Sequence, residues 1–311
     1  MKTHRTLVPS LLVCFFAATS TGLHATTVFS SASSYNVYVL GTMQESNVDS
    51  EGRVAVAGNA TLTNYGVGSK FQASPSSAGN SLVVGGNLAY NGGEVHYGNI
   101  VYGGTLSGNF GVPNGSITHG SPVDFTATNN YLLTASSYWS NLTSTGSTIN
   151  NYGGIQLIGT DPNLNVFTLS GSMLSSSWGV TIDAPAGSTI LVNVSGTTDL
   201  FRYMGIQFQD LNGDGTGVAN RQNVLYNFYE ATSLEINGIS VQGSILAPKA
   251  TVNFGNGNVE GNLIAGNLYG NGEAHNYLFT GSLPSPVSVP EPSVPLLSVA
   301  TLTLLVLRRR R

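Results

Sequence analysis

Apolar residues in this chain occur in short groups separated by glycine and asparagine, and the groups near the C-terminus repeat with a fixed period. The segment that begins at Val241 returns 18 residues later at Val259, so that Ile245 corresponds to Leu263. A short fixed period of apolar pairs and glycines is typical of stacked coils.

A strand with only two or three inward apolar residues cannot bury itself, so each coil must stack on its neighbours to form a continuous core. Glycine and asparagine supply the positive-φ corners that turn the chain about every six residues. Eighteen residues then make one three-sided coil. Strands about 4.8 Å apart would place Val241 over Val259 and Ile245 over Leu263.

The same unit occurs near the N-terminus, where the run at Val83 returns 18 residues later at Val101. A degenerate copy begins at Val54, and the polar segment 69–79 accounts for the longer step that follows it. Short apolar runs between residues 153 and 196 predict further coils. The pattern predicts an all-β fold, a β-solenoid of the right-handed β-helix type that includes both ends of the domain.

One segment has a helical pattern instead. Ser121 fits an N-cap, Pro122 the first helical position and Asp124 the third. We expect one capping or flanking helix of about twenty residues, with apolar positions at near-helical spacing: Phe125, Leu132, Ala135, Trp139 and Leu142.

Charge is scarce, because only 8% of residues are charged while 41% are apolar. This composition fits neither a disordered chain nor a typical cytosolic enzyme. Between residues 26 and 290 five basic residues face fourteen acidic ones, a net charge of about −9. We therefore expect no nucleic-acid partner, and favour divalent cations or cationic surfaces.

The N-terminus has the three parts of a secretory signal peptide: basic residues at Lys2 and Arg5, an apolar run over 11–18, and a small-residue end at Ala25. We expect cleavage after Ala25. The single cysteine, Cys14, lies in this segment, so the exported protein would have no disulfide and no cysteine-ligated metal.

The C-terminus has the order of a sorting signal: a short motif, an apolar run from Val294 to Leu307, and a basic end. Fourteen helical residues span about 21 Å, less than the roughly 30 Å of a bilayer core, which indicates a transient anchor with a positive-inside stop. The order resembles the PEP-CTERM signal of Gram-negative bacteria, which an exosortase processes; a plain tail anchor is the alternative. The motif and the basic end are Val289, Pro290, Glu291, Pro292 and Arg308, Arg309, Arg310, Arg311. The predicted divisions are 1–25, 26–284 and 285–311.

Asp210, Asn212 and Asp214, followed by Gly215, match the first half of a calcium loop, in which alternate oxygen ligands converge on one ion. The twelfth position is Arg221, where a bidentate glutamate is needed. The alternatives are a calcium site and a polar hairpin turn. No other cofactor is expected.

Two further groups of charged residues are candidates for chemistry. Asp49, Glu51 and Arg53 form either a cation or ligand contact or a solvated corner with one ion pair. Glu273 and His275 form a tight acid and imidazole pair, which either satisfies backbone groups at a turn of the last coil or acts in acid/base catalysis. Hydrolysis of a glycoside would also need a second carboxylate at the right distance.

The body of the chain resembles the choice-of-anchor A proteins over most of residues 30–281, through segments 36–41, 49–59, 225–232, 243–248 and 270–275. The resemblance implies an extracellular domain with an adhesive role, carried on a surface-attachment signal, and it implies no catalytic residues. Relative to that family, residues 210–221 look like a local insertion.

These observations predict an exported, non-enzymatic, adhesin-like protein of the cell surface or extracellular matrix of a Gram-negative bacterium. Its partners would be an exosortase and an extracellular polysaccharide or cell-surface ligand, with transient membrane contact. The alternative is an enzyme that acts on extracellular polysaccharide. Ice binding would require ladders of Thr-x-Thr, and Thr61 and Thr63 are close to alone in that pattern.

Overall fold

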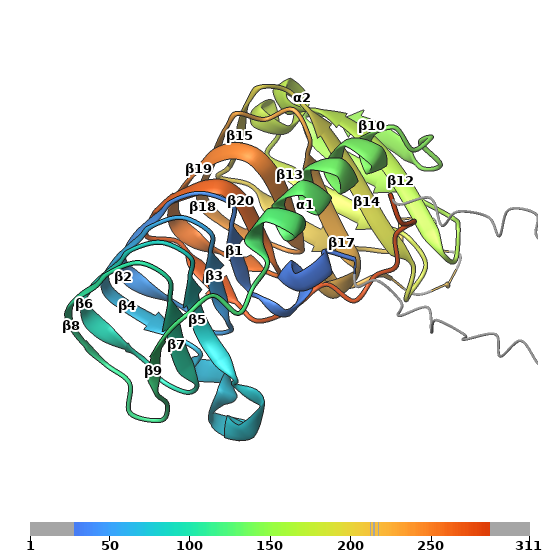
Figure 1. The fold of residues 1–311 in the computed structure, drawn as a ribbon. Coiled ribbons are helices and arrows are strands. Elements are labelled where there is room, and N and C mark those ends of the chain that lie inside the picture. The colour runs from blue at the N-terminus through green and yellow to red at the C-terminus, as the bar shows by residue number, and fades with distance from the viewer. Residues whose placement is uncertain (1–27, 212, 214, 217, 287–311) are drawn as a thin grey trace, which may run out of the picture.

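The computed structural model describes residues 28–211, 213, 215–216 and 218–286, which form a β-solenoid of parallel strands (Figure 1). Each complete coil contributes up to three strand segments, and these stack in three columns. The first column consists, in spatial order, of β9 (Ile117–His119), β7 (Asn99–Tyr102), β5 (Asn80–Val84), β3 (Val54–Val56), β1 (Val37–Val39), β20 (Leu263–Gly270), β19 (Ser244–Glu260), β17 (Val224–Phe228), β14 (Thr189–Ser195) and β12 (Leu164–Ser170).

The second column continues the same coils around the next corner. It consists of β8 (Leu106–Gly111), β6 (Leu88–Val95), β4 (Ala60–Val67), β2 (Met43–Ser50), the later parts of β20 and β19, β18 (Ser233–Val241) and β15 (Thr198–Arg202). Several of these strands bend into the third column, where they meet β21 (Glu273–His275).

A separate four-stranded sheet closes the third side at one end of the solenoid. It contains β10 (Ser147–Asn151), β11 (Gly154–Ile158), β13 (Gly179–Asp183) and β16 (Gly205–Phe208), in that order. The helices are α1 (Phe125–Ser140) and the short α2 (Gly171–Ser176), and the 3-10 turns are η1 (Ser30–Ser34), η2 (Ser69–Ala73), η3 (Pro75–Ser77) and η4 (Arg221–Asn223).

The predicted registers are confirmed. Val241 is paired with Val259 and Ile245 with Leu263, as the 18-residue period requires. At the other end, Val83 is paired with Val101. The polar segment 69–79 is an insertion that forms η2 and η3 between two coils, so β3 stacks directly on β5.

The spatial order of the coils differs from their order along the chain. The first coil lies on the last one, because β1 pairs with β20 on one side and with β3 on the other. Asn36 is fully buried at this seam, where its Nδ2 donates to Gly261 O at 2.7 Å and to His275 O at 2.9 Å. Its Oδ1 accepts from Gly52 N at 3.2 Å. One side chain therefore connects the two ends of the domain.

The first column is apolar on both sides, as buried parallel strands commonly are. Its inner side faces the solenoid core, and its outer side lies under α1, which runs lengthwise along this flank (Figure 1). Leu132, Ala135 and Trp139 of α1 are buried there against strand residues such as Tyr38 and Ile264. The flanking position predicted for the helix is confirmed.

Two details of the helix prediction are wrong. The N-cap is Asp124 rather than Ser121, and the Asp124 carboxylate accepts from Ala127 N at 2.9 Å. The carboxylate satisfies an otherwise unpaired N–H of the first turn, so the helix begins at Phe125 and has 16 residues rather than about twenty. The second correction is α2, a short helix that the sequence pattern did not indicate.

Replacing Asn36 with alanine should destabilise the domain by about 3 kcal/mol, because the buried Gly261 carbonyl and the partly buried His275 carbonyl lose their shared donor. Chemical denaturation measures the free energy of unfolding. The exposed Asn91 is the matched control, and its replacement with alanine should change stability by no more than about 0.5 kcal/mol. Equal effects of the two substitutions would show that Asn36 does not join the coils.

Candidate functional site

The acidic residues singled out from the sequence meet at the seam between the first and last coils. Strand β21 lies between β2 and β19, which brings Glu273 and His275 close to Asp49 and Glu51 on one side and to Glu260 on the other. We refer to these five residues as the seam cluster. Glu260 was not identified from the sequence, since it becomes a neighbour of His275 only when two coils stack.

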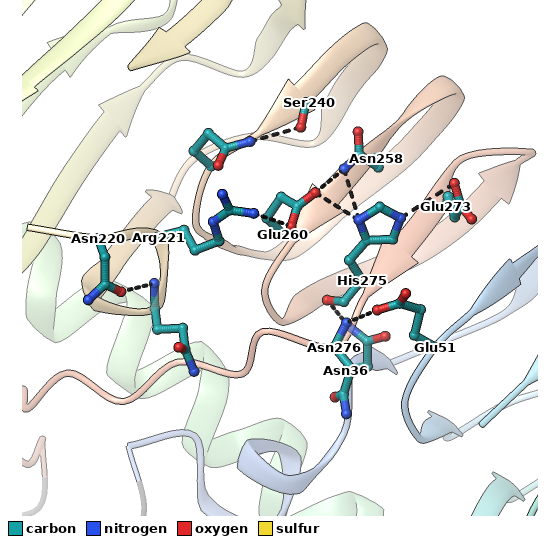
Figure 2. Close-up of polar contacts among 12 residues, drawn as sticks. Asn36, Glu51, Asn220, Arg221, Ser240, Asn258, Glu260, Glu273, His275 and Asn276 are labelled. Atoms are coloured by element: carbon teal, nitrogen blue, oxygen red, sulfur yellow. Dashed lines mark hydrogen bonds and ion pairs between the residues drawn. The ribbon is translucent and has the colours of Figure 1, made fainter. Parts of the chain in front are cut away.

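His275 is the centre of the seam cluster (Figure 2). Its Nδ1 lies 2.7 Å from Glu260 Oε1, and its Nε2 lies 3.5 Å from Glu273 Oε2. The other oxygen of Glu260 is 2.5 Å from Arg221. Glu51 pairs with Lys70 of the insertion at 3.0 Å. The predicted Glu273 and His275 pair is therefore part of a larger network of ion pairs.

Burial and neighbouring charges shift two pKa values here. Burial acts to lower the pKa of His275, but the hydrogen bond and charge of Glu260 outweigh it and raise the pKa above the ordinary 6.5. Burial, together with a hydrogen bond to Glu273 and its charge, raises the pKa of Asp49 to about 6. Both shifts favour the protonated form, so the imidazole among these carboxylates keeps its charge to a higher pH than a free histidine does.

This arrangement fits the structural interpretation of Glu273 and His275 better than the catalytic one. The imidazole is held by carboxylates from both sides, and the Glu260 carboxylate is shared between His275 and Arg221. Within the part of the chain that the structure describes, no group of three or more His, Cys, Asp or Glu is arranged to hold a metal ion. The network joins β19, β21 and β2.

Arg53 does not belong to the seam cluster, although it follows Glu51 closely in sequence. Its guanidinium donates to the backbone oxygens of Ala78, Ser77 and Ser34, and lies 5.1 Å from the centre of the Phe71 ring. Arg53 therefore fastens the 69–79 insertion to the coil. A second acid and imidazole pair, Glu94 and His96 at 2.8 Å, has the same spacing in sequence as Glu273 and His275 and was not identified from it.

The other sequence candidates lie largely outside the described residues. Asp210 is described, and its carboxylate accepts from Gly213 N at 2.6 Å and Gly215 N at 3.3 Å, as in a closed turn. Asn212 and Asp214 lie outside, as do the sorting motif and the apolar segment from Val294 to Leu307. Among the described residues, no helix is long and apolar enough to cross a membrane.

A second candidate surface is the outer side of strands β2, β4, β6 and β8. The outward residues of these strands in the second column are all uncharged, and most carry a hydroxyl or an amide. We call this surface the outer sheet face; it consists of Gln44, Ser46, Thr61, Thr63, Ala89, Asn91, Ser107 and Asn109.

The outer sheet face has regular rows because the strands are in register. Thr61 lies between Gln44 and Ala89, and Thr63 lies between Ser46 and Asn91. The two threonines therefore do not extend into a threonine ladder on these rows. The surface is a sheet of mixed hydroxyl and amide groups.

A family model described as "Putative Ice-binding-like adhesive domain" matches residues 28–276. The chain belongs to this family. Membership in an adhesive-domain family indicates a surface or adhesin-type protein rather than an enzyme. No curated protein matches the chain.

Two crystal structures are similar to this adhesive domain. One is an ice-binding protein from the Antarctic ascomycete Antarctomyces psychrotrophicus, with 13% identity, a TM-score of 0.36, and coverage of 82% of this chain and 98% of that chain. The other is an ice-binding protein from an Antarctic biological consortium, with 13% identity, a TM-score of 0.39, and coverage of 88% and 96%.

The seam also contains a buried acid that was not identified from the sequence. Glu45 points into the core between Leu62 and Gly270 on the neighbouring strands, and neither carboxylate oxygen has a hydrogen-bond partner among the described residues. Burial raises its pKa to about 9. The alternation of inward and outward residues along β2 is the signal that places Glu45 inside.

Glu45 should make the domain less stable as the pH rises from about 5 to 9. The folded state keeps a proton that the unfolded chain releases above about 4.5, so the free energy of unfolding falls by up to about 1.4 kcal/mol per pH unit. Thermal unfolding of Glu45→Gln across this range should lack that slope. An identical pH dependence in both proteins would refute the buried, protonated state.

His275 should change stability in the same direction, because its raised pKa also favours the protonated form in the folded state. Its raised pKa stabilises the fold fully below about 6.5, and the contribution declines as the pH rises through the folded pKa. His275→Gln should therefore cost about 1 kcal/mol at pH 5.5 and less at pH 9, because the pair is partly exposed. A larger cost at pH 9 than at pH 5.5 would contradict the charged pair with Glu260.

Proposed function

We propose that this protein is an exported, non-enzymatic adhesin of the cell surface or extracellular matrix, and that it holds an extracellular polysaccharide or cell-surface ligand on the outer sheet face. The observation that carries the proposal is the composition of that face. Its eight outward residues carry no charge, and the parallel register aligns them in rows.

Hydroxyl and amide side chains both donate and accept hydrogen bonds, so they match the hydroxyl groups of a polysaccharide. Strands about 4.8 Å apart repeat these groups regularly along the solenoid. A long polymer can therefore make many weak contacts at once, which is how multivalent binding gains strength. The lack of charge on the face favours a neutral ligand over an ionic one.

Delivery to the surface would use the two terminal segments. The signal peptide over 1–25 directs export, and the segment 285–311, with Val289, Pro290, Glu291 and Pro292, directs sorting by an exosortase after transient membrane contact. These signals and the sequence motifs support assignment to the choice-of-anchor A proteins of Gram-negative bacteria. This assignment agrees with membership in an adhesive-domain family.

An enzyme that acts on polysaccharide remains the alternative hypothesis. Its candidate residues, Glu273 and His275, are held within the seam cluster. If they were catalytic, the purified protein would shorten a glycan chain and Glu273→Gln would abolish the reaction. Saturable binding without any product, unchanged in Glu273→Gln, supports the adhesin.

Adding bulky charges to the outer sheet face should abolish adhesion without unfolding the domain. The double substitution Thr61→Lys and Asn91→Lys should weaken binding to extracted cell matrix and to neutral polysaccharides at least tenfold, because both lysines interrupt the rows of neutral groups. Binding is measured with purified protein on immobilised polysaccharide, with calcium and with a chelator, which also tests the proposed site at Asp210.

The matched control is Asn130→Lys, an exposed position on α1, which covers the first column rather than the second. It adds the same kind of charge and should leave binding unchanged. Equal loss of binding in both proteins, or no loss in either, would contradict the assignment of adhesion to the outer sheet face.

A further inference from the structure

Two large aromatic side chains are strongly exposed at one corner of the solenoid. Trp178 is 63% exposed and Tyr203 is 67% exposed. Trp178 directly precedes β13 and Tyr203 lies two residues before β16. The two strands are parallel neighbours, with Gly179 opposite Gly205, so the two aromatic residues lie on adjacent coils. Exposed aromatic residues grouped in this way commonly mark a binding surface.

Both rings are held in place by glycines. A Cβ on Gly154 would lie 2.5 Å from the Trp178 ring, and the Trp178 indole Nε1 donates to Tyr152 O at 3.0 Å. A Cβ on Gly238 would lie 2.6 Å from the Tyr203 ring. The rings therefore rest on bare backbone and stay largely exposed, and the Arg202 guanidinium lies 5.7 Å from the centre of the Tyr203 ring. Little side-chain freedom remains to be lost when a ligand stacks on them.

A groove of about 390 Å³ continues from this corner across β18, β19 and β20. Asn237, whose backbone oxygen accepts from Tyr203 N at 3.1 Å, lines its near end, and Tyr269 lines its far end. Glu235 and Asn253 lie between them, with Asn253 opposite both Glu235 and Tyr269 in register.

The groove has charge on one wall. Arg202 holds Glu235 Oε1 at 2.6 Å, and both side chains are partly exposed. Because Glu235 is paired with Arg202, this wall has no net positive charge to attract uronate or sulfate groups, while the amides of Asn237 and Asn253 supply donors and acceptors. This chemistry selects a neutral ligand with many hydroxyl groups.

We propose that Trp178, Tyr203, Tyr269 and the groove between the two tyrosines form a binding site for a chain of neutral sugars. The apolar face of a sugar ring stacks on the aromatic rings, and its hydroxyl groups bond to the asparagines and Glu235. Three strand spacings, about 14 Å, separate Tyr203 from Tyr269 along the axis, so the site fits an oligosaccharide rather than a single sugar. This inference rests on the proposed adhesive function and names its ligand class.

The first test is calorimetric titration of the purified full chain, in mild detergent, with neutral gluco-, xylo- and manno-hexaoses and with an oligoglucuronate. At least one neutral hexaose should bind and the oligoglucuronate should not. Tyr269→Ala and Tyr203→Asn should each raise the Kd at least tenfold. Asparagine is chosen for position 203 because the backbone there has φ of +52°, which asparagine tolerates. Tyr138→Ala, an exposed tyrosine of α1, is the control and should change the Kd less than twofold.

A second measurement uses the unaltered protein and does not depend on the folding of variants. The chain has two tryptophans, of which Trp139 is fully buried and Trp178 exposed. The hexaose that binds should protect the fluorescence of Trp178 from acrylamide, and Trp178→Phe should remove the quenchable component.

The outcomes separate this inference from the proposed function. Adhesion to matrix without binding of any neutral hexaose, or binding that is insensitive to Tyr203→Asn and Tyr269→Ala, overturns the sugar site and leaves the adhesin standing. Selective binding of the oligoglucuronate, or of matrix proteins alone, also overturns it. If the unaltered protein binds neither cell matrix nor polysaccharide, the proposed function itself is refuted.

Discussion

The structure depends on the contact between the first and the last coil. Pairing of β1 with β20 converts two separate stacks, one from each end of the chain, into a single solenoid. Asn36 completes this contact by bonding to the backbone on both sides of the seam. Without the pairing, each stack would expose an open sheet edge in the middle of the molecule, and exposed strand edges invite aggregation.

The proposed function follows from the same stacking. Parallel register sets the rows of the outer sheet face. It also places Trp178, Tyr203 and the groove on successive coils of the stack. The acid and imidazole groups that suggested catalysis lie at the seam, where Glu260 pairs with His275 and Arg221, and where Glu51 accepts from Asn276 N at 3.0 Å. The proposed adhesion would use this rigid stack and its long repeated surface.

The local features of the fold could be predicted from the sequence. The 18-residue period determines the pairs Val241 with Val259 and Val83 with Val101, because identical spacing of apolar residues allows only that register. The order of the coils could not be predicted, since nothing local specifies that Val37 meets Leu263. The helix start was misplaced because Ser121 and Asp124 are both suitable caps, and only the packing of α1 selects between them.

The candidate site was predicted only in part. Glu273 and His275 were identified from their spacing, but their partner Glu260 lies in another coil and becomes adjacent only through stacking. Glu45 carries no local sign of a site, because it lies within an alternating strand, apart from the charged corners, and only the alternation along β2 indicates that it points inward. The platforms under Trp178 and Tyr203 depend on glycines far away in the sequence or one coil apart, which no local pattern reveals.

The most direct test of the seam is a disulfide between its two sides. Ser50 and Ala274 are small, buried partners on adjacent parallel strands, about 4.8 Å apart and within the roughly 4.4–6.8 Å that a disulfide spans. The only natural cysteine, Cys14, belongs to the predicted signal peptide.

Thiol titration of the denatured, exported protein carrying Ser50→Cys and Ala274→Cys should find no free thiol after mild oxidation. The pair Ser50→Cys and Val241→Cys, three strand spacings apart, should keep both thiols free. Two free thiols in the first protein would show that the first and last coils do not meet, and would contradict the single solenoid.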